Sequence, residues 1–373
     1  NPYRIAAEAI KHIPRDFHEE IGKSRLRAGD VVVARTGRPG TAAVIPDWLP
    51  DANCSDLVVI RTGPNVDARY LTYFLNSQHG QDLIRARHVG SVQVHFNIGA
   101  AKSLPFLLRP LDEQRRIAAV LGALDDKIEL NRKMNATLEE MAQVLFKSWF
   151  IDFDGHDDLV ESELGMIPRG WEAGVISDLI DIVGGGTPKK SEGRYWGEGI
   201  PWFSVKDAPP PSDLFVVDTE LQITDAGLSE SSARLVPPRT TIISARGTVG
   251  KLALTAVPMA FNQSCYGIRP SEDYGELFVH FSIREVVEQL RQAAHGSVFD
   301  TITRKTFDIS RLVIPPVEAA NRFEAIAGPL ADKILLNVRE SRTLAELRDT
   351  LLPKLISGEI RVPEAEEEVE AMV

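Results

Sequence analysis

The stretch ALDDKIELNRKMNATLEEMAQVLF, residues 123–146, returns later in the chain as PLADKILLNVRESRTLAELRDTLL, residues 329–352. The two copies align without a gap at a constant shift of 206 positions, so that Asn131 falls on Asn337. A repeat of this length indicates a duplicated architecture, and it decides how the rest of the sequence is interpreted.

Both copies carry apolar residues at alternating steps of four and three, the spacing of helices that pack along one stripe. This stripe, here called the seam, has a polar break at its middle in each copy. We predict two helices of roughly 35 residues, each about 50 Å long, that pack on each other. Buried asparagines would fix the register of the pair at a cost in stability. The predicted helix-pair interface consists of Leu121, Leu124, Ile128, Asn131, Leu138, Leu145, Leu330, Ile334, Asn337, Leu344 and Leu351.

The segments ahead of the two helices are related as well, at a shift of 210. GDVVVARTGRPGTAAVI, residues 29–45, and RTTIISARGTVGKLALT, residues 239–255, each predict a strand, a tight Gly-x-x-Gly turn and a second strand. The chain therefore alternates globule, helix, globule, helix. The second globule opens with residues 171–207, which have no counterpart in the first, so we expect the first globule to be incomplete at its N-terminus.

Composition is that of a soluble protein with more than one domain: 373 residues, 43% hydrophobic and 25% charged. Cys54 and Cys265 are too few for a disulfide framework, and no apolar run is long enough to cross a membrane, which predicts a cytoplasmic location. The net charge of −11 does not exclude a nucleic-acid partner, because binding depends on the local field of one face. Much of the acidity lies in the repeated segments and in the tail EAEEEVEAM, which we expect to be solvated or disordered.

Each segment that resembles a catalytic or ligand-binding motif lacks a residue that the motif requires. ARGTVGKL, residues 245–252, has Ala245 where a phosphate-binding loop requires glycine. DFDGHDDLVESE, residues 152–163, has Asp157 where a calcium loop requires glycine. His88 and His95 have no metal-ligand partner nearby in the sequence. We predict a chain that is not an enzyme and that holds no metal or cofactor of its own.

Polar and basic loops are the more informative feature. In GGGTPKKSEGRYW, residues 184–196, glycines would let backbone N–H groups approach a phosphate, and the cations would neutralise it or contact guanine edges. An ordinary charged surface loop is the alternative. Similar polar groups recur at the two Gly-x-x-Gly turns and in residues 85–97 and 292–305. The predicted DNA-binding residues are Arg35, Thr36, Arg38, Thr41, Arg87, His88, Ser91, Gln93, His95, Lys189, Lys190, Arg194, Tyr195, Trp196, Lys206, Ser244, Arg246, Thr248, Lys251, Ser297, Thr301, Thr303, Arg304 and Lys305.

Five phrases carry a resemblance to a known family. RPLDEQRRIAAVLGALDDKIELNRKMNATLEEMAQVLFKSWFIDFD and LLPKLISGEI are similar to the central and C-terminal conserved regions of the DNA specificity subunit of type I restriction–modification systems. GGGTPKK, IPWFSVKD and NQSCYGIRP resemble phrases of its target-recognition domains. The resemblance implies an α/β fold with two target-recognition domains separated by two long antiparallel, coiled-coil-like helices, with an internal pseudo-twofold repeat.

The same resemblance implies the division of the chain: target-recognition domain 1 (residues 1–110, N-terminally incomplete), a central long helix and linker (111–163), target-recognition domain 2 (164–316), and a C-terminal long helix with the acidic tail (317–373). It implies a non-catalytic subunit that reads a bipartite, asymmetric site on double-stranded DNA. Two adenine-N6 methyltransferase subunits would bind the chain and bring restriction and translocase subunits with them. S-adenosylmethionine and ATP with Mg²⁺ are expected on those partners, and no membrane is involved.

Two other functions stay open at this point. One is a DNA-binding enzyme, a methyltransferase or nuclease with unrecognised motifs. The other is a coiled-coil scaffold that binds only proteins.

Overall fold

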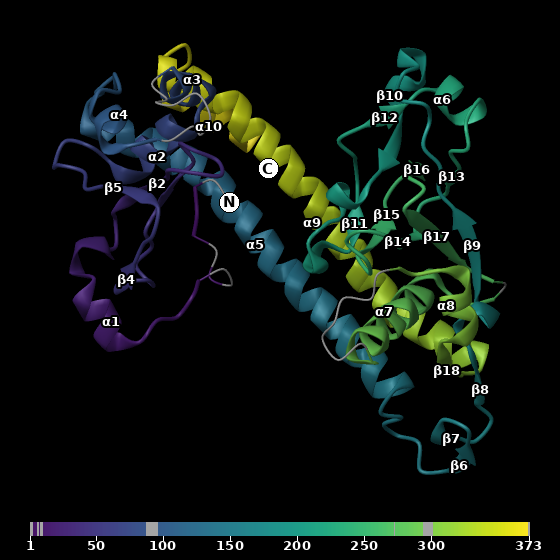
Figure 1. Ribbon diagram of the computed structural model, residues 1–373. Coiled ribbons are helices and arrows are strands. Elements are labelled where there is room, and N and C mark those ends of the chain that lie inside the picture. Colours follow the sequence, from purple (N-terminus) through teal and green to yellow (C-terminus); the bar gives the residue numbers. More distant parts are fainter. Residues whose placement is uncertain are drawn as a thin grey trace. The chain divides into compact units, whose positions relative to one another are not determined.

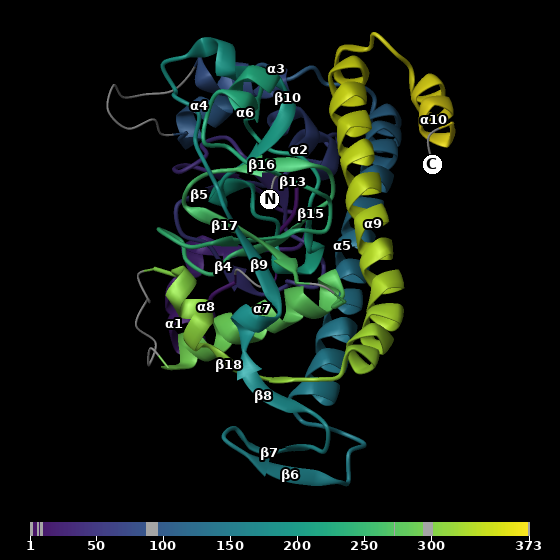
Figure 2. The same cartoon turned by 90° about the vertical axis from the view of Figure 1, so that its right-hand side faces the viewer.

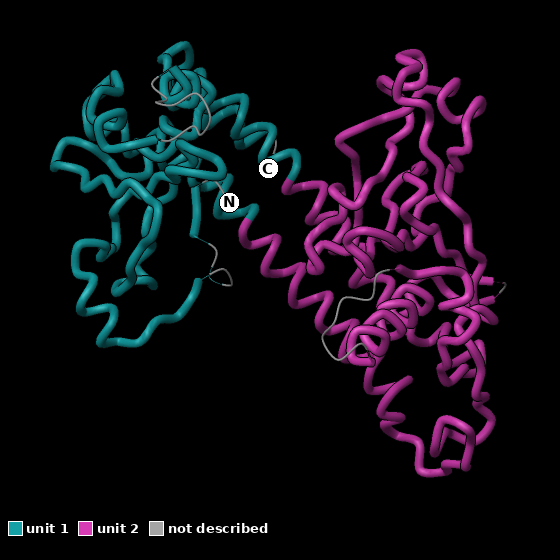
Figure 3. Tube along the Cα trace, viewed as in Figure 1, with its two compact units in different colours: residues 1–128, 342–373 teal, residues 129–341 magenta. Residues whose placement is uncertain are grey.

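The computed structural model describes residues 3–5, 7, 10–86, 96–271, 273–293 and 301–371. The chain forms two compact units, unit 1 (residues 1–128 and 342–373) and unit 2 (residues 129–341) (Figure 3). Two long helices, α5 (Leu111–Phe150, 40 residues) and α9 (Val317–Ser357, 41 residues), each contribute a part to both units (Figure 1). The compact units therefore follow a different division from the four consecutive parts expected from the sequence.

Unit 1 is built on a three-stranded antiparallel sheet of order β3-β2-β5. Asp67 caps the helix that packs against this sheet, accepting a hydrogen bond from the Tyr70 N–H at 3.0 Å. Its elements are α1 (Arg15–Glu20), η2 (Gly22–Ser24), β1 (Arg25–Leu26), β2 (Val31–Ala34), β3 (Ala42–Val44), β4 (Ala52–Asn53), β5 (Leu57–Ile60), α2 (Ala68–Asn76), α3 (Gln78–Arg85), α4 (Ile98–Lys102) and α10 (Val362–Glu370).

Unit 2 contains a five-stranded sheet of order β11-β15-β14-β17-β9 and a four-stranded sheet of order β12-β10-β16-β13. Two two-stranded antiparallel sheets complete it, β18 with β8 and the hairpin of β6 with β7. Its elements are β6 (Leu159–Ser162), β7 (Gly165–Pro168), β8 (Glu172–Val175), η3 (Ile176–Asp178), β9 (Ile180–Gly184), η4 (Gly193–Tyr195), β10 (Trp196–Phe203), η5 (Val205–Asp207), η6 (Pro211–Asp213), β11 (Phe215–Val216), β12 (Gln222–Ile223), α6 (Asp225–Ser229), β13 (Leu235–Val236), β14 (Thr241–Ser244), β15 (Leu252–Thr255), β16 (Met259–Phe261), β17 (Cys265–Pro270), α7 (Glu276–Ala293), α8 (Arg304–Ile309) and β18 (Arg311–Ile314).

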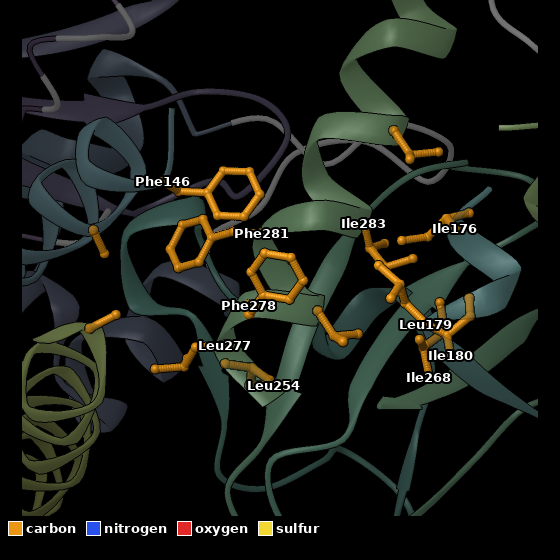
Figure 4. Packing of buried hydrophobic residues seen from close by; sticks show 14 of the residues in the cluster. Phe146, Ile176, Leu179, Ile180, Leu254, Ile268, Leu277, Phe278, Phe281 and Ile283 are labelled. Carbon is orange, nitrogen blue, oxygen red and sulfur yellow. The ribbon is translucent and has the colours of Figure 1, made fainter. Parts of the chain in front are cut away.

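Aromatic side chains join the helix pair to the sheet in unit 2. The ring of Phe146 on α5 lies 5.9 Å from Phe278 and 5.8 Å from Phe281 on α7 (Figure 4). It lies 5.6 Å from the ring of Phe323 on α9. These rings belong to one buried cluster that reaches Ile268 of the five-stranded sheet. Such rings bury much apolar area each, so the core of this unit depends on both long helices.

The polar break of the seam lies in unit 2, where α5 and α9 run side by side (Figures 1 and 2). The Asn131 side-chain amide donates to a Glu340 carboxylate oxygen at 2.8 Å, and the Asn337 amide donates to the Asn135 side-chain carbonyl at 2.9 Å. Asn131 contacts Glu340, whereas Asn135, which comes later in α5, contacts Asn337, which comes earlier in α9. The two helices are therefore antiparallel. Each asparagine side chain thus hydrogen-bonds to the facing helix. The side-chain amides of Asn131 and Asn337 do not hydrogen-bond to each other.

In unit 1 the seam instead contains a charged network. An Arg348 guanidinium nitrogen of α9 lies 2.6 Å from an Asp125 carboxylate oxygen of α5, with the two side chains 14% and 9% exposed. The Tyr73 hydroxyl donates to the same carboxylate at 2.5 Å, and Arg348 lies over the ring of Tyr3. Burial alone lowers the pKa of Arg348, but hydrogen bonds to Asp125 and Asp349 outweigh it and raise the pKa above its usual value.

The residues predicted for the helix-pair interface are buried or half-buried throughout. Leu121, Leu124, Ile128, Leu344 and Leu351 lie in the core of unit 1. In unit 2, Asn131, Ile334 and Asn337 are buried, and the partly buried residues packed against its core include Leu138, Leu145 and Leu330.

The acidic tail differs from expectation. Residues 362–370 form α10, in which Val362 and Ala365 are buried in the core of unit 1 and Val369 packs against it. Spacings of three and four place these small apolar residues on one face of a helix, while the glutamates occupy the rest. The expectation of a solvated or disordered end is wrong for this segment, because net acidity does not remove the apolar stripe.

The predicted fold class, an α/β chain with an internal repeat and two long antiparallel helices, is confirmed. Within the described part of the chain, no helix combines the length and apolar character needed to cross a membrane.

The charged network makes a quantitative prediction. Replacing Arg348 with alanine should lower the free energy of unfolding by about 3–5 kcal/mol, because Asp125 would stay buried without its counter-charge. The double variant with Asp125→Ala should lose clearly less than Arg348→Ala alone. Urea unfolding at neutral pH measures both.

A matched control is Arg169→Ala, which breaks the fully exposed ion pair with Asp158 and should leave the unfolding midpoint unchanged. Equal losses in the single and double Arg348 variants would contradict the assignment of a buried, mutually dependent pair.

Candidate nucleic-acid interface

The turn between β14 and β15 carries exposed polar groups in unit 2. It closes through hydrogen bonds from the Ser244 N–H to the Lys251 carbonyl at 2.9 Å and from the Gly250 N–H to the Ser244 carbonyl at 2.8 Å. Gly247 and Gly250 have φ angles of 77° and 79°, a left-handed region that glycine enters without steric cost. The turn therefore holds Arg246 exposed on a fixed backbone.

Unit 1 repeats this turn between β2 and β3. The Ala34 N–H donates to the Thr41 carbonyl and the Gly40 N–H to the Ala34 carbonyl, both at 2.9 Å. Gly37 and Gly40 have φ angles of 70° and 92°. Arg38 is exposed at its tip. The two turns are the same scaffold.

The segment 261–265 joins the turn of unit 2 to the glycine-rich loop. The Ala245 N–H donates to the Ser264 carbonyl at 2.7 Å, and the Gly186 N–H donates to the Phe261 carbonyl at 2.9 Å. The Ala245 carbonyl in turn accepts from the Ile302 N–H at 2.9 Å. Three polar phrases that are far apart in sequence are thereby brought together: residues 184–196, 244–251 and 301–305.

The glycines of the loop have a different role from the one expected. A Cβ atom on Gly185 would lie 2.1 Å from the Asn262 carbonyl oxygen, and one on Gly186 would lie 2.1 Å from that of Ser232. The Gly185 N–H donates to the Cys265 carbonyl at 3.4 Å. The expectation that these amides approach a phosphate is therefore wrong: they donate within the protein, and glycine is needed because two backbones touch.

Two tryptophans hold the same loop in place. The Trp196 indole N–H donates to the Lys189 carbonyl at 3.2 Å, and that of Trp202 donates to the Gly186 carbonyl at 3.0 Å. Their rings meet edge to face at 5.1 Å. Trp196 is thus fixed by contacts within the loop, while Lys189 and Lys190 stay exposed.

Two predicted DNA contacts are buried instead. Tyr195 is buried, and its hydroxyl lies 3.2 Å from a Glu230 carboxylate oxygen. Ser244 is buried, and its hydroxyl donates to the Thr248 carbonyl at 2.5 Å and accepts from the Lys251 N–H at 2.8 Å. Because both hydroxyls are used inside the fold, these placements disagree with the predicted contacts and assign both residues to the scaffold.

Other predicted residues already have protein partners at the surface. Arg194 forms an ion pair with Glu230 at 2.5 Å, and hydrogen bonding to that carboxylate raises the pKa of Arg194. Arg304 donates to the Ile182 carbonyl at 2.8 Å. The remaining pairs are Arg35 and Thr36 with Asp56, Thr301 with the Ala245 carbonyl, and Thr303 with Thr306.

A set of exposed cations has no carboxylate partner within the described part of the chain. Such groups can neutralise phosphates or donate to guanine edges. The set consists of Arg38, Lys189, Lys190, Lys206, Arg246, Lys251 and Lys305. Thr41 and Thr248 lie at the same turns. Arg87, His88, Ser91, Gln93, His95 and Ser297 lie outside the described residues.

One exposed amide at this place was not among the predicted residues. Gln263 lies in the joining segment, and its side-chain oxygen accepts a hydrogen bond from the Thr187 hydroxyl. A glutamine amide has the donor and acceptor pattern that matches adenine. The polar phrase NQSC, residues 262–265, is the sequence signal for this position.

Two groups of the kind used in acid–base or nucleophilic chemistry, His280 and Cys265, are buried, which disfavours their charged forms. Burial lowers the pKa of His280 to about 4 and raises that of Cys265 to about 12. Among the described residues, no group of three or more His, Cys, Asp or Glu side chains could hold a metal ion.

Known proteins similar to this chain are specificity subunits of type I restriction enzymes. The family described as "Type I restriction modification DNA specificity domain" matches residues 5–140 and 168–327. The type I restriction enzyme HindI specificity subunit of Haemophilus influenzae is 27% identical over 408 residues, covering 91% of this chain and 88% of that protein. The MjaIX specificity subunit of Methanocaldococcus jannaschii is 26% identical, covering 80% and 70%. The crystal structure of a type I restriction–modification S subunit from M. genitalium has the same fold, with a TM-score of 0.53 at 16% identity, covering 88% of this chain and 83% of that one.

Proposed function

The chain belongs to the family of type I restriction modification DNA specificity domains, and on that premise we propose that it is a non-catalytic subunit that reads a bipartite, asymmetric site on double-stranded DNA. The observation that carries the proposal is the duplicated turn. Each unit presents one Gly-x-x-Gly turn with the same backbone hydrogen bonds and exposed polar side chains.

Differences between the two turns support an asymmetric site. At a shift of 210 residues the backbone hydrogen bonds of the turn are the same, but three of its polar side chains differ. Arginine and lysine pair best with guanine, whereas threonine contacts thymine methyls or either class of base. Two turns with the same backbone but different side chains therefore select two different half-sites. The exchanged pairs are Thr36 with Arg246, Arg38 with Thr248, and Thr41 with Lys251.

Partner subunits then carry out the catalytic reactions. The relatives are named specificity subunits of type I restriction enzymes. We infer two adenine-N6 methyltransferase subunits as direct partners, with restriction and translocase subunits joining through them. S-adenosylmethionine and ATP with Mg²⁺ would be held by those partners. The cytoplasmic location stays a prediction.

Two equivalent apolar positions support the inferred number of methyltransferase subunits, two for each chain. Leu130 on α5 and Leu336 on α9 correspond under the 206-residue shift, and both are exposed, by 51% and 58%. Large apolar side chains at matching exposed places on a duplicated helix fit two identical partners.

Reading by the turn is tested by Arg246→Ala and Lys251→Ala in the assembled complex. If the side chain contacts a base edge, binding should weaken by about 1–3 kcal/mol, and only for DNA that carries the preferred base in one half-site. Binding to a panel of single-base variants of the site measures this, with Arg169→Ala as the control. A uniform loss would mark a phosphate contact, and unchanged binding by both variants would contradict the proposed interface.

Copy number is tested by native mass spectrometry of the co-expressed complex. The wild-type chain should carry two methyltransferase subunits, and Leu130→Glu and Leu336→Glu should each lose one, because a buried unpaired charge opposes association. Leu221→Glu, at an exposed leucine of unit 2 outside the long helices, is the control. A single partner on the wild-type chain would refute two equivalent sites, and full turnover by the chain alone would refute the non-catalytic role.

A further inference from the structure

The second glycine of each Gly-x-x-Gly turn lies against a helix of its own unit. Gly40 in unit 1 and Gly250 in unit 2 are both buried. A Cβ atom on Gly40 would lie 2.9 Å from the Ile84 side chain of α3. A buried backbone carbonyl needs a donor from within the protein, and in both units a residue of the helix supplies it.

A single side chain makes this contact in each unit. In unit 1, the Gln81 amide nitrogen on α3 donates to the Gly40 carbonyl at 3.0 Å. In unit 2, the Arg291 guanidinium on α7 donates to the Gly250 carbonyl at 3.2 Å. Donor and acceptor are 41 positions apart in both cases, so Gln81 falls on Arg291 at the same shift of 210 that relates the turns. The two units therefore share the contact although they differ in the residue that makes it.

An N–H donor, and not a charge, is what the two residues have in common. The side-chain nitrogen of a glutamine carries two hydrogens. That of Gln81 donates to the Leu75 carbonyl at 2.8 Å as well as to the turn, so both hydrogens are used inside the fold. Arg291 is charged, but a Glu288 carboxylate oxygen lies 3.6 Å from its guanidinium. These contacts indicate a shared role that acts on the turn.

We propose that Gln81 and Arg291 are positioning residues for DNA recognition, which hold the second glycine of each turn and so fix the direction of Arg38 and Arg246 at its tip. The inference rests on the proposed reading of DNA by the two turns. A contact to a base edge requires placement to within about 0.5 Å, whereas attraction to phosphates acts over a longer range. Loss of the contact should therefore reduce discrimination between bases more than overall affinity.

Base discrimination by the assembled complex provides the first test. Arg291→Ala should lower the preference for the correct base about fivefold in the half-site read by unit 2, the effect of one lost hydrogen bond, and leave the other half-site unchanged. Gln81→Ala should do the reverse. Binding to a panel of single-base variants of the site measures both preferences. The matched control is Gln289→Ala on α7, at an exposed residue whose amide donates to Glu285 of the same helix.

Exchange of one donor for the other separates positioning from a phosphate contact. Arg291→Gln removes the charge but keeps an N–H donor, so it should restore the preference that Arg291→Ala loses. If Arg291 bound a phosphate, Arg291→Gln would instead weaken binding to all sequences alike and lower the slope of the salt dependence by about one. That result, or an equal loss of preference in both variants, would overturn the proposal.

Hydrogen–deuterium exchange of the full chain without DNA tests the contact independently of base reading. The Gly250 and Lys251 amides donate to Ser244 at 2.8 Å each. Both should exchange about fivefold faster in Arg291→Ala, because the turn opens more often, and at the wild-type rate in Arg291→Gln. Unchanged exchange in Arg291→Ala would overturn the positioning role.

Faster exchange with unchanged base preference is resolved by Arg246→Ala at the tip of the turn. If Arg246→Ala loses base preference, the turn reads DNA without needing Arg291, and the positioning role is overturned. If Arg246→Ala binds DNA as the wild type does, the proposed reading by this turn has failed, and the inference that rests on it falls as well.

Discussion

The antiparallel pairing of α5 with α9 is the constraint on which the rest of the structure depends. Neither compact unit has a core without it: unit 1 closes around residues of α5 before Glu129 and of α9 after Ser341, and unit 2 around the parts between them. A slip of one helical turn would move every seam residue by 5.4 Å. It would separate Asp125 from Arg348 and displace Phe146 from the rings of α7 and α9. The packing of both cores therefore fixes the register of α5 against α9.

The duplication has diverged where the helices meet the domains. Unit 1 uses a buried ion pair with a tyrosine, whereas the positions that correspond to Arg348 and Asp125 in unit 2 are the small buried residues Ala142 and Ala331. There the aromatic rings around Phe146 fill the space. A buried pair contributes little net stability but penalises any arrangement that separates its charges. The ion pair thus sets which helix faces which, and the aromatic cluster supplies apolar burial.

Much of this was accessible from sequence, because periodicity and glycine spacing report backbone geometry. The seam of Leu124 and Asn131 and the turn at Gly247 and Gly250 follow from such patterns. The roles of single polar groups do not follow from such patterns, because these roles depend on neighbours that are distant in sequence. Ser244 supports its turn from inside, and Gly186 is required by a backbone 46 positions later, at Ser232. The tail around Ala365 forms a docked helix where its acidic composition predicts a solvated end, because composition does not report a short apolar stripe.

The DNA-reading role proposed here requires that two equal scaffolds with different side chains each determine one part of a DNA site. It is tested most directly by replacing residues 164–316 with the aligned segment of a relative and mapping methylated adenines in cells that express the partner subunits. One block of bases in the methylated sequence should change while the other block is retained. A change in both blocks, or in neither, would contradict it.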